Sequence, residues 1–177
     1  MNERDTIFLL EDNSLLLEQL QEALERNEYI NKVQAIVFPC ASIELAITVY
    51  EEIEDRIACL VCDSNMSSVG LSENFRNISE GGLFSGWLWM IEKIKADESL
   101  ADRSIVYSAY YDELQAIIRQ TSLFRRVPCI RKKTITSWEN EEIIKEIVRI
   151  LKAQKGRLKC LQKEMTEKPM KENKKTR

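Results

Sequence analysis

Short apolar runs rich in β-branched residues alternate along the chain with longer stretches in which apolar residues recur every three or four positions. The short runs predict five strands, at residues 6–10, 33–38, 57–62, 103–108 and 127–131. The longer stretches predict helices at residues 14–26, 42–53, 86–96, 112–121 and from 139 onward. This alternation is typical of an α/β fold with a doubly wound parallel sheet, right-handed connections and helices on both faces.

One segment, at about residues 66–85, interrupts the pattern between the third strand and the third helix. It contains three glycines and no apolar period, so we predict a long loop there. Loops of this length are uncommon inside compact domains and often carry function.

Charge is divided unevenly along the chain, although the net charge is only −3. Residues 1–151 contain 16 Lys and Arg against 26 Asp and Glu, a net charge of −10, and residues 152–177 contain 10 against 3, a net charge of +7. We therefore expect an acidic domain over residues 1–152 and a basic C-terminal helix extension or tail over 153–177. No direct DNA binding is expected, because phosphate contacts come mainly from Lys and Arg and the tail is too short to form a further domain.

Residue types and run lengths exclude several classes of protein. No apolar run approaches the roughly 18 residues needed to span a bilayer, and the first residues lack the apolar core of a signal peptide. We therefore expect a cytoplasmic protein whose five Cys, an odd number without regular spacing, stay reduced. The sequence contains no His, which removes His-based catalysis and His-ligated zinc.

The last predicted helix carries an apolar stripe that runs past the domain. Its positions follow the spacing of a coiled coil, with Gln154 filling one of them: Ile147, Leu151, Leu158, Leu161 and Met165. Gly156 opposes a helix there by about 1 kcal/mol. The pattern predicts an extension to about Met165 that could form a homodimer or bind a partner helix.

Polar side chains follow the predicted strands at the point where each strand ends. Glu11 and Asp12 follow the first strand and Asp63 follows the third. Ser108 ends the fourth strand, and Lys132 lies in a basic run after the fifth. Because parallel strands end at one edge of the sheet, we expect these groups to converge. Three carboxylates would repel one another without a cation, and hard oxygen ligands suit Mg²⁺.

These fragments resemble the receiver domain of two-component response regulators, over roughly residues 5–152. The resemblance depends on four motifs in order, LLEDN at 9–13, LVCDSNM at 60–66, VYSA at 106–109 and IRK at 130–132. It implies a flavodoxin-like five-stranded sheet in the order 2-1-3-4-5.

The resemblance also implies a role for each site residue. Asp63 would be the phosphoacceptor, Ser108 the switch hydroxyl and Lys132 the phosphate-contacting lysine. The Mg²⁺ ligands would be Glu11, Asp12, Asp63 and the main-chain carbonyl of Asn65. Its partners would be a histidine kinase or phosphotransfer protein and a downstream protein, and the chain would catalyse only its own phosphoryl transfer and hydrolysis.

The chain departs from the family pattern at several positions beside this site. Ser67 and Lys133 stand where the family usually has Pro, and Cys129 stands at the position of the switch aromatic residue. These departures motivate an alternative, a degenerate receiver that acts as a phosphorylation-independent adaptor. A Mg²⁺-dependent phosphatase with Asp63 as nucleophile is a third hypothesis, weakened because Asn65 offers no acid for the leaving group.

Overall fold

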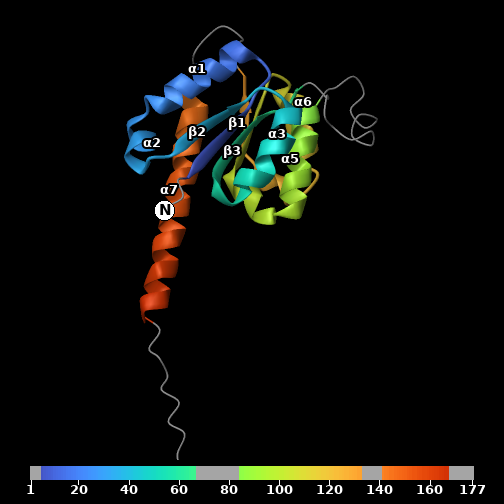
Figure 1. Ribbon diagram of the computed structural model, residues 1–177. Helices are drawn as coiled ribbons and strands as arrows, with labels where there is room; N and C mark the ends of the chain where they lie inside the picture. Colours follow the sequence, from blue (N-terminus) through green and yellow to red (C-terminus); the bar gives the residue numbers. More distant parts are fainter. Residues whose placement is uncertain (1–4, 67–83, 133–140, 168–177) are drawn as a thin grey trace, which may run out of the picture.

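Five parallel strands form the centre of the molecule, which was analysed as a computed structural model describing residues 5–66, 84–132 and 141–167 (Figure 1). The strands are β1 (Thr6–Leu10), β2 (Ile36–Cys40), β3 (Ile57–Asp63), β4 (Ser104–Ser108) and β5 (Cys129–Arg131). Their order in the sheet is β2-β1-β3-β4-β5, and every pair is parallel. This confirms the predicted α/β fold and strand order.

Helices cover both faces of the sheet, as predicted. They are α1 (Ser14–Glu25), α2 (Glu28–Val33), α3 (Ile43–Ile53), α5 (Ser85–Ala96), α6 (Tyr111–Ile118) and α7 (Glu141–Glu167). One hydrophobic cluster joins α3, α5 and α6 to one face of the sheet. The other joins α1, α2 and α7 to the opposite face.

The central strand β3 is buried along its whole length, because it supplies both clusters. Leu60 and Cys62 belong to the cluster under α3, α5 and α6, whereas Cys59 and Val61 belong to the cluster under α1, α2 and α7. Cys59 and Cys62, three residues apart in the chain, therefore lie on opposite faces of the sheet, and both serve as core residues.

The predicted strand over 33–38 is wrong by about three residues. The chain instead forms the short helix α2, whose N-cap Asn27 accepts hydrogen bonds from the amides of Tyr29 and Ile30. Gln34 ends the helix with a left-handed backbone, φ 58°. β2 then starts at Ile36, and as an edge strand it accommodates Pro39.

The last helix, α7, is continuous from Glu141 to Glu167 and projects well beyond the sheet (Figure 1). Its first half packs on the sheet through buried Ile143, Ile147 and Leu151. Gly156 lies inside this helix, and a Cβ atom added there would meet nothing within 4 Å.

Two predictions are addressed only in part by the described residues. The loop predicted at about 66–85 falls almost wholly outside them, and so do Ser67, Lys133 and the end of the basic tail. Among the helices that the structure does describe, none combines the length and apolarity needed to cross a bilayer.

Candidate functional site

The predicted site residues lie together at the carboxyl edge of the sheet. Glu11 and Asp12 directly follow β1, Asp63 ends β3, Ser108 ends β4 and Lys132 directly follows β5. The strand register brings them level, because Leu10 is paired with Cys62 and Asp63 with Tyr107, while Ser108 is paired with Arg131. The convergence therefore follows from the parallel topology.

The Lys132 ammonium bridges two of the carboxylates. Its Nζ lies 2.7 Å from Oε2 of Glu11 and 2.6 Å from Oδ2 of Asp63. All three side chains are nearly enclosed, with 10% of the Lys132 side chain and 7% of each of the other two exposed. The contact joins residues 121 and 69 positions apart in the chain, so it depends on the complete fold.

The second oxygen of each buried carboxylate is held by the main chain. The Asn13 amide donates to Oε1 of Glu11, and the Asn65 amide donates to Oδ1 of Asp63, both at 3.1 Å. The side chain of Asn13 also caps α1 by accepting from the Leu16 amide. Local turns thus orient Glu11 and Asp63 before any ligand arrives.

Burial and neighbouring charge shift the protonation of the site. Burial, reinforced by the negative charge of Asp63, raises the pKa of Glu11 to about 7 in spite of Lys132. Burial also raises the pKa of Asp63, and Lys132 opposes that rise. Burial alone would lower the pKa of Lys132, but the carboxylates of Asp63 and Glu11 raise it above its usual value. Two buried carboxylates sharing one ammonium leave negative charge to be balanced.

A divalent cation fits the donor set of this site. Carboxylate oxygens of Glu11, Asp12 and Asp63 all lie within 4.8 Å of one another, two of them buried and Asp12 exposed. Three carboxylates beside one ammonium carry net negative charge, and hard oxygen donors with an open side match Mg²⁺, which keeps part of its water shell. Asn65, the predicted main-chain ligand, lies two residues after Asp63 and is oriented by its amide hydrogen bond.

The hydroxyl of Ser108 is buried and already hydrogen-bonded. The Ser64 hydroxyl donates to its Oγ at 2.6 Å, and the Tyr110 amide donates at 2.9 Å. The main-chain oxygen of Ser64 also accepts from the amides of Gly86 and Trp87 at the start of α5. Sequence reasoning did not single out Ser64, and its position directly after Asp63 was the only signal available.

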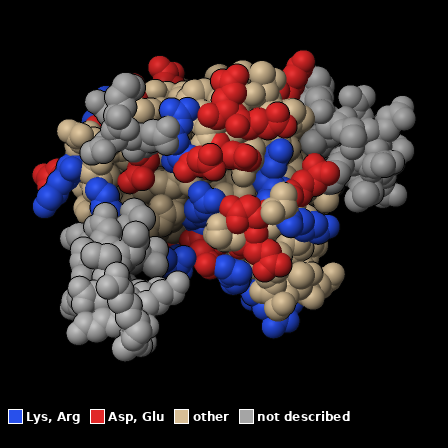
Figure 2. Space-filling view, turned by 60° about the horizontal axis from the view of Figure 1, so that its bottom comes forward, with Lys and Arg blue, Asp and Glu red and all other residues tan. Residues whose placement is uncertain are grey.

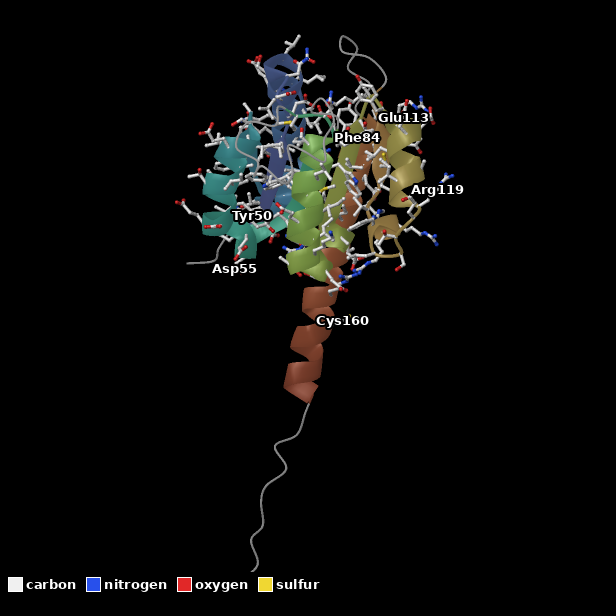
Figure 3. All side chains as sticks on the ribbon, turned by 90° about the vertical axis from the view of Figure 1, so that its right-hand side faces the viewer. Tyr50, Asp55, Phe84, Glu113, Arg119 and Cys160 are labelled. Carbon is white, nitrogen blue, oxygen red and sulfur yellow. The ribbon has the colours of Figure 1, made fainter. Side chains whose placement is uncertain are left out.

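Gly86 permits the close approach of α5 to the site and was also missed as a functional position. A Cβ atom there would clash with the main-chain oxygen of Asp63 and lie 2.8 Å from Cγ of Met66. Only glycine fits such an approach. Phe84, the residue just before α5 (Figure 3), has a φ of 64°. Its ring packs edge-on against Tyr110, with ring centroids 6.2 Å apart.

The position of the family's switch aromatic residue is occupied by a thiol. Cys129 is half-buried at the start of β5, and burial raises its pKa to about 11. Of the two nearby tyrosines, Tyr110 packs on Phe84, whereas Tyr111 lies under the Arg131 guanidinium at 4.8 Å. Tyr110 therefore contacts Ser108 through its main-chain amide, whereas its ring contacts Phe84.

Comparisons with known proteins support the fold. The chain is similar to the crystal structure of a response regulator receiver domain protein from Clostridium thermocellum, with a TM-score of 0.60 and 16% sequence identity over 85% of this chain and 97% of that one. It is also similar to the crystal structure of a sensor protein from Polaromonas sp. JS666, with a TM-score of 0.53 and 18% identity over 85% of this chain and 98% of that one. No family model matches the sequence, and a search of the curated proteins found no match.

Proposed function

We propose that this chain, which has the fold of a receiver domain, is a phosphorylation switch that accepts a phosphoryl group on Asp63. The donor is a histidine kinase or a phosphotransfer protein, and the output is a change in binding to a downstream protein. Glu11, Asp12, Asp63 and the main-chain carbonyl of Asn65 would hold Mg²⁺. The switch operates in the cytoplasm.

The observation that carries the proposal is the Lys132 ammonium, held between Asp63 and Glu11 beside Asp12. In the proposed transfer a carboxylate oxygen of Asp63 attacks phosphorus and the bond from phosphorus to the donor nitrogen breaks, with the electron pair and a proton going to that nitrogen. The Lys132 ammonium moves from the Asp63 carboxylate to the phosphoryl oxygens and stabilises their negative charge. Mg²⁺, when bound, supplies further charge neutralisation.

In this proposal the phosphoryl group does not come from a His within this sequence, because the sequence has no His. The chain itself then catalyses only the transfer to Asp63 and the later hydrolysis, and it does not act on a diffusible substrate. Asn65, two residues after Asp63, provides no general acid for a phosphatase cycle.

A phosphorylation-independent adaptor is the second candidate, and one observation favours it. The Ser108 hydroxyl oxygen accepts hydrogen bonds from the Ser64 hydroxyl and the Tyr110 amide, so its position is already fixed without a phosphoryl group on Asp63. In the adaptor model this network is static and partner binding does not depend on phosphate.

Intact-mass measurement after incubation with Mg²⁺ and a small-molecule phosphodonor tests the proposal. One phosphoryl mass should be added to the unmodified sequence and to Asp112→Asn, a control at an exposed carboxylate that pairs with Arg131 near the same edge. No mass should be added to Asp63→Asn. Labelling of Asp63→Asn would place the phosphoryl group on another residue and contradict the proposal. No labelling of the unmodified protein, together with unchanged partner binding, would favour the adaptor.

A further inference from the structure

Ser64 follows Asp63 in the chain, and its side chain bonds to Ser108. Both serines are fully buried. The Ser64 hydroxyl donates a hydrogen bond to Oγ of Ser108 at 2.6 Å, a usual distance between two hydroxyl oxygens. The residue directly after the proposed phosphoacceptor therefore contacts the hydroxyl that ends β4.

The main chain of Ser64 is held from two sides. Its amide donates to the main-chain oxygen of Tyr107 in β4 at 3.3 Å. Its own main-chain oxygen accepts from the amides of Gly86 at 3.1 Å and Trp87 at 3.3 Å, both at the start of α5. Because the main chain is fixed, only rotation about χ1 changes the direction of the Ser64 hydroxyl.

A second donor holds Ser108 from the other side. The Tyr110 amide donates to its Oγ at 2.9 Å. The Tyr110 ring packs edge-on against Phe84, the residue just before α5. Both donors to Ser108 therefore depend on where α5 begins.

The hydrogen-bonding capacity of Ser108 is only partly used. A serine hydroxyl has one hydrogen to donate and two lone pairs that accept. Both lone pairs are occupied, by the Ser64 hydroxyl and the Tyr110 amide. The main-chain oxygen of Ser108 accepts from the Lys132 amide at 2.8 Å. Within residues 5–66, 84–132 and 141–167, the hydroxyl hydrogen of Ser108 has no acceptor, so it is free to donate to a group that arrives at the site.

We propose that Ser64 is a positioning residue for phosphoryl transfer to Asp63, because by donating to Ser108 it directs the Ser108 hydrogen to a phosphoryl oxygen. The inference rests on the proposed function. The Ser108 hydroxyl donates a hydrogen bond that stabilises the charge of the phosphoryl oxygen, and no proton changes atoms. If Ser108 donated to Ser64 instead, no hydrogen would remain for the phosphoryl group. Ser64 acts only through Ser108.

A purely structural role for the same hydrogen bond makes a different prediction. If the bond only satisfies two buried hydroxyls, its loss lowers stability and has no specific effect on phosphoryl transfer. Ser104 provides a matched control, because it is also fully buried in β4 and donates to the main-chain oxygen of Leu100 at 2.7 Å. It begins β4, at the opposite edge of the sheet from Ser108. Figure 2 turns that end of the molecule forward, and Lys and Arg are intermixed with Asp and Glu there.

Intact-mass kinetics on the full chain, with a small-molecule phosphodonor and a series of Mg²⁺ concentrations, test the inference. Ser64→Ala should lower the maximal labelling rate about fivefold, the effect of one hydrogen bond between neutral groups. The Mg²⁺ concentration for half-maximal labelling should not change, because the Ser64 side chain is not a proposed ligand. Ser104→Ala should be labelled at the rate of the unmodified protein. Urea denaturation checks that each variant is folded.

A double variant shows whether Ser64 acts through Ser108. Ser108→Ala removes the hydroxyl that Ser64 positions, so it should slow labelling at least as much as Ser64→Ala. Ser64→Ala/Ser108→Ala should then be labelled at the same rate as Ser108→Ala, since two residues in one hydrogen bond do not have additive effects.

Three results would overturn the inference while leaving phosphorylation of Asp63 intact. They are an unchanged maximal rate in Ser64→Ala, an equal slowing in Ser104→Ala, and a further loss of about fivefold when Ser64→Ala is added to Ser108→Ala. Absence of labelling from the unmodified protein would contradict the proposed function itself, and the inference with it.

Discussion

The two ends of the sheet both carry clusters of Asp and Glu, but they differ in burial. At the carboxyl edge Glu11 and Asp63 are almost fully enclosed and share Lys132, and burial raises the pKa of Glu11 to about 7. At the amino edge Glu51, Glu54 and Asp55 are exposed, and hydrogen bonds from Arg126 lower the pKa of the nearby Asp102. The same residue types therefore differ in protonation and pairing between an edge where water is excluded and one where it is not.

The largest expected effect contrasts the ion pairs at the two ends. Lys132→Ala leaves two buried carboxylates without a cation, so it should destabilise the protein by about 3 kcal/mol. Arg126→Ala breaks the solvent-exposed pair with Asp102 and should destabilise the protein much less than Lys132→Ala. Urea denaturation measures both. Equal losses in the free energy of unfolding would contradict the claim that burial makes the ion pair at the carboxyl edge the more important one.

A glycine beside the site should matter next. Gly86→Ala places a Cβ atom against the main-chain oxygen of Asp63, so it should destabilise the fold by about 2 kcal/mol and slow phosphoryl labelling. Denaturation and intact-mass kinetics report the two effects. A Gly86→Ala protein with unchanged stability would mean that α5 can move away from Asp63 at little cost.

Mg²⁺ binding sharpens the comparison between the two acidic clusters. Asp12→Ala removes one hard ligand and its charge, so it should raise the Kd for Mg²⁺ about tenfold, equivalent to about 1.4 kcal/mol. Asp102→Ala at the other end should leave the Kd unchanged. Titration followed by the intrinsic fluorescence of the three tryptophans, Trp87, Trp89 and Trp138, provides the readout. If both substitutions raised the Kd for Mg²⁺ equally, the affinity would depend on the net negative charge of the protein and not on a ligand bond from Asp12.

The smallest effect belongs to the glycine of the projecting helix. Gly156→Ala meets no neighbour within 4 Å, so it should favour the helix by up to about 1 kcal/mol. Helix content measured by circular dichroism should rise slightly, and the denaturation midpoint should not fall. A loss of stability would place Gly156 in a contact that requires glycine.

The strand pattern and the residues at the strand ends could be predicted because both are local signals. A parallel sheet then brings Glu11, Asp63 and Lys132 to one edge without knowledge of any contact. The boundary of β2 could not be predicted, because Asn27 and Gln34 create a short helix where the apolar pattern alone favours a strand.

Two residues beside the site were missed for a related reason. Ser64 matters through its bond to Ser108, 44 positions away, and Gly86 through the approach of α5 to Asp63. Such roles depend on contacts between distant segments, which leave no periodic trace in the sequence. The basic extension, by contrast, was visible as a change in charge along the chain.

The most direct test of the proposed switch is to identify the labelled atom. An acyl phosphate on a carboxylate is reduced by borohydride to an alcohol, so an Asp that carries the phosphoryl group becomes homoserine. After incubation with Mg²⁺ and a phosphodonor, peptide mass spectrometry should find homoserine at position 63, and chelation of Mg²⁺ should abolish it. Homoserine at another carboxylate, or an unchanged Asp63 in the presence of Mg²⁺, would contradict the account.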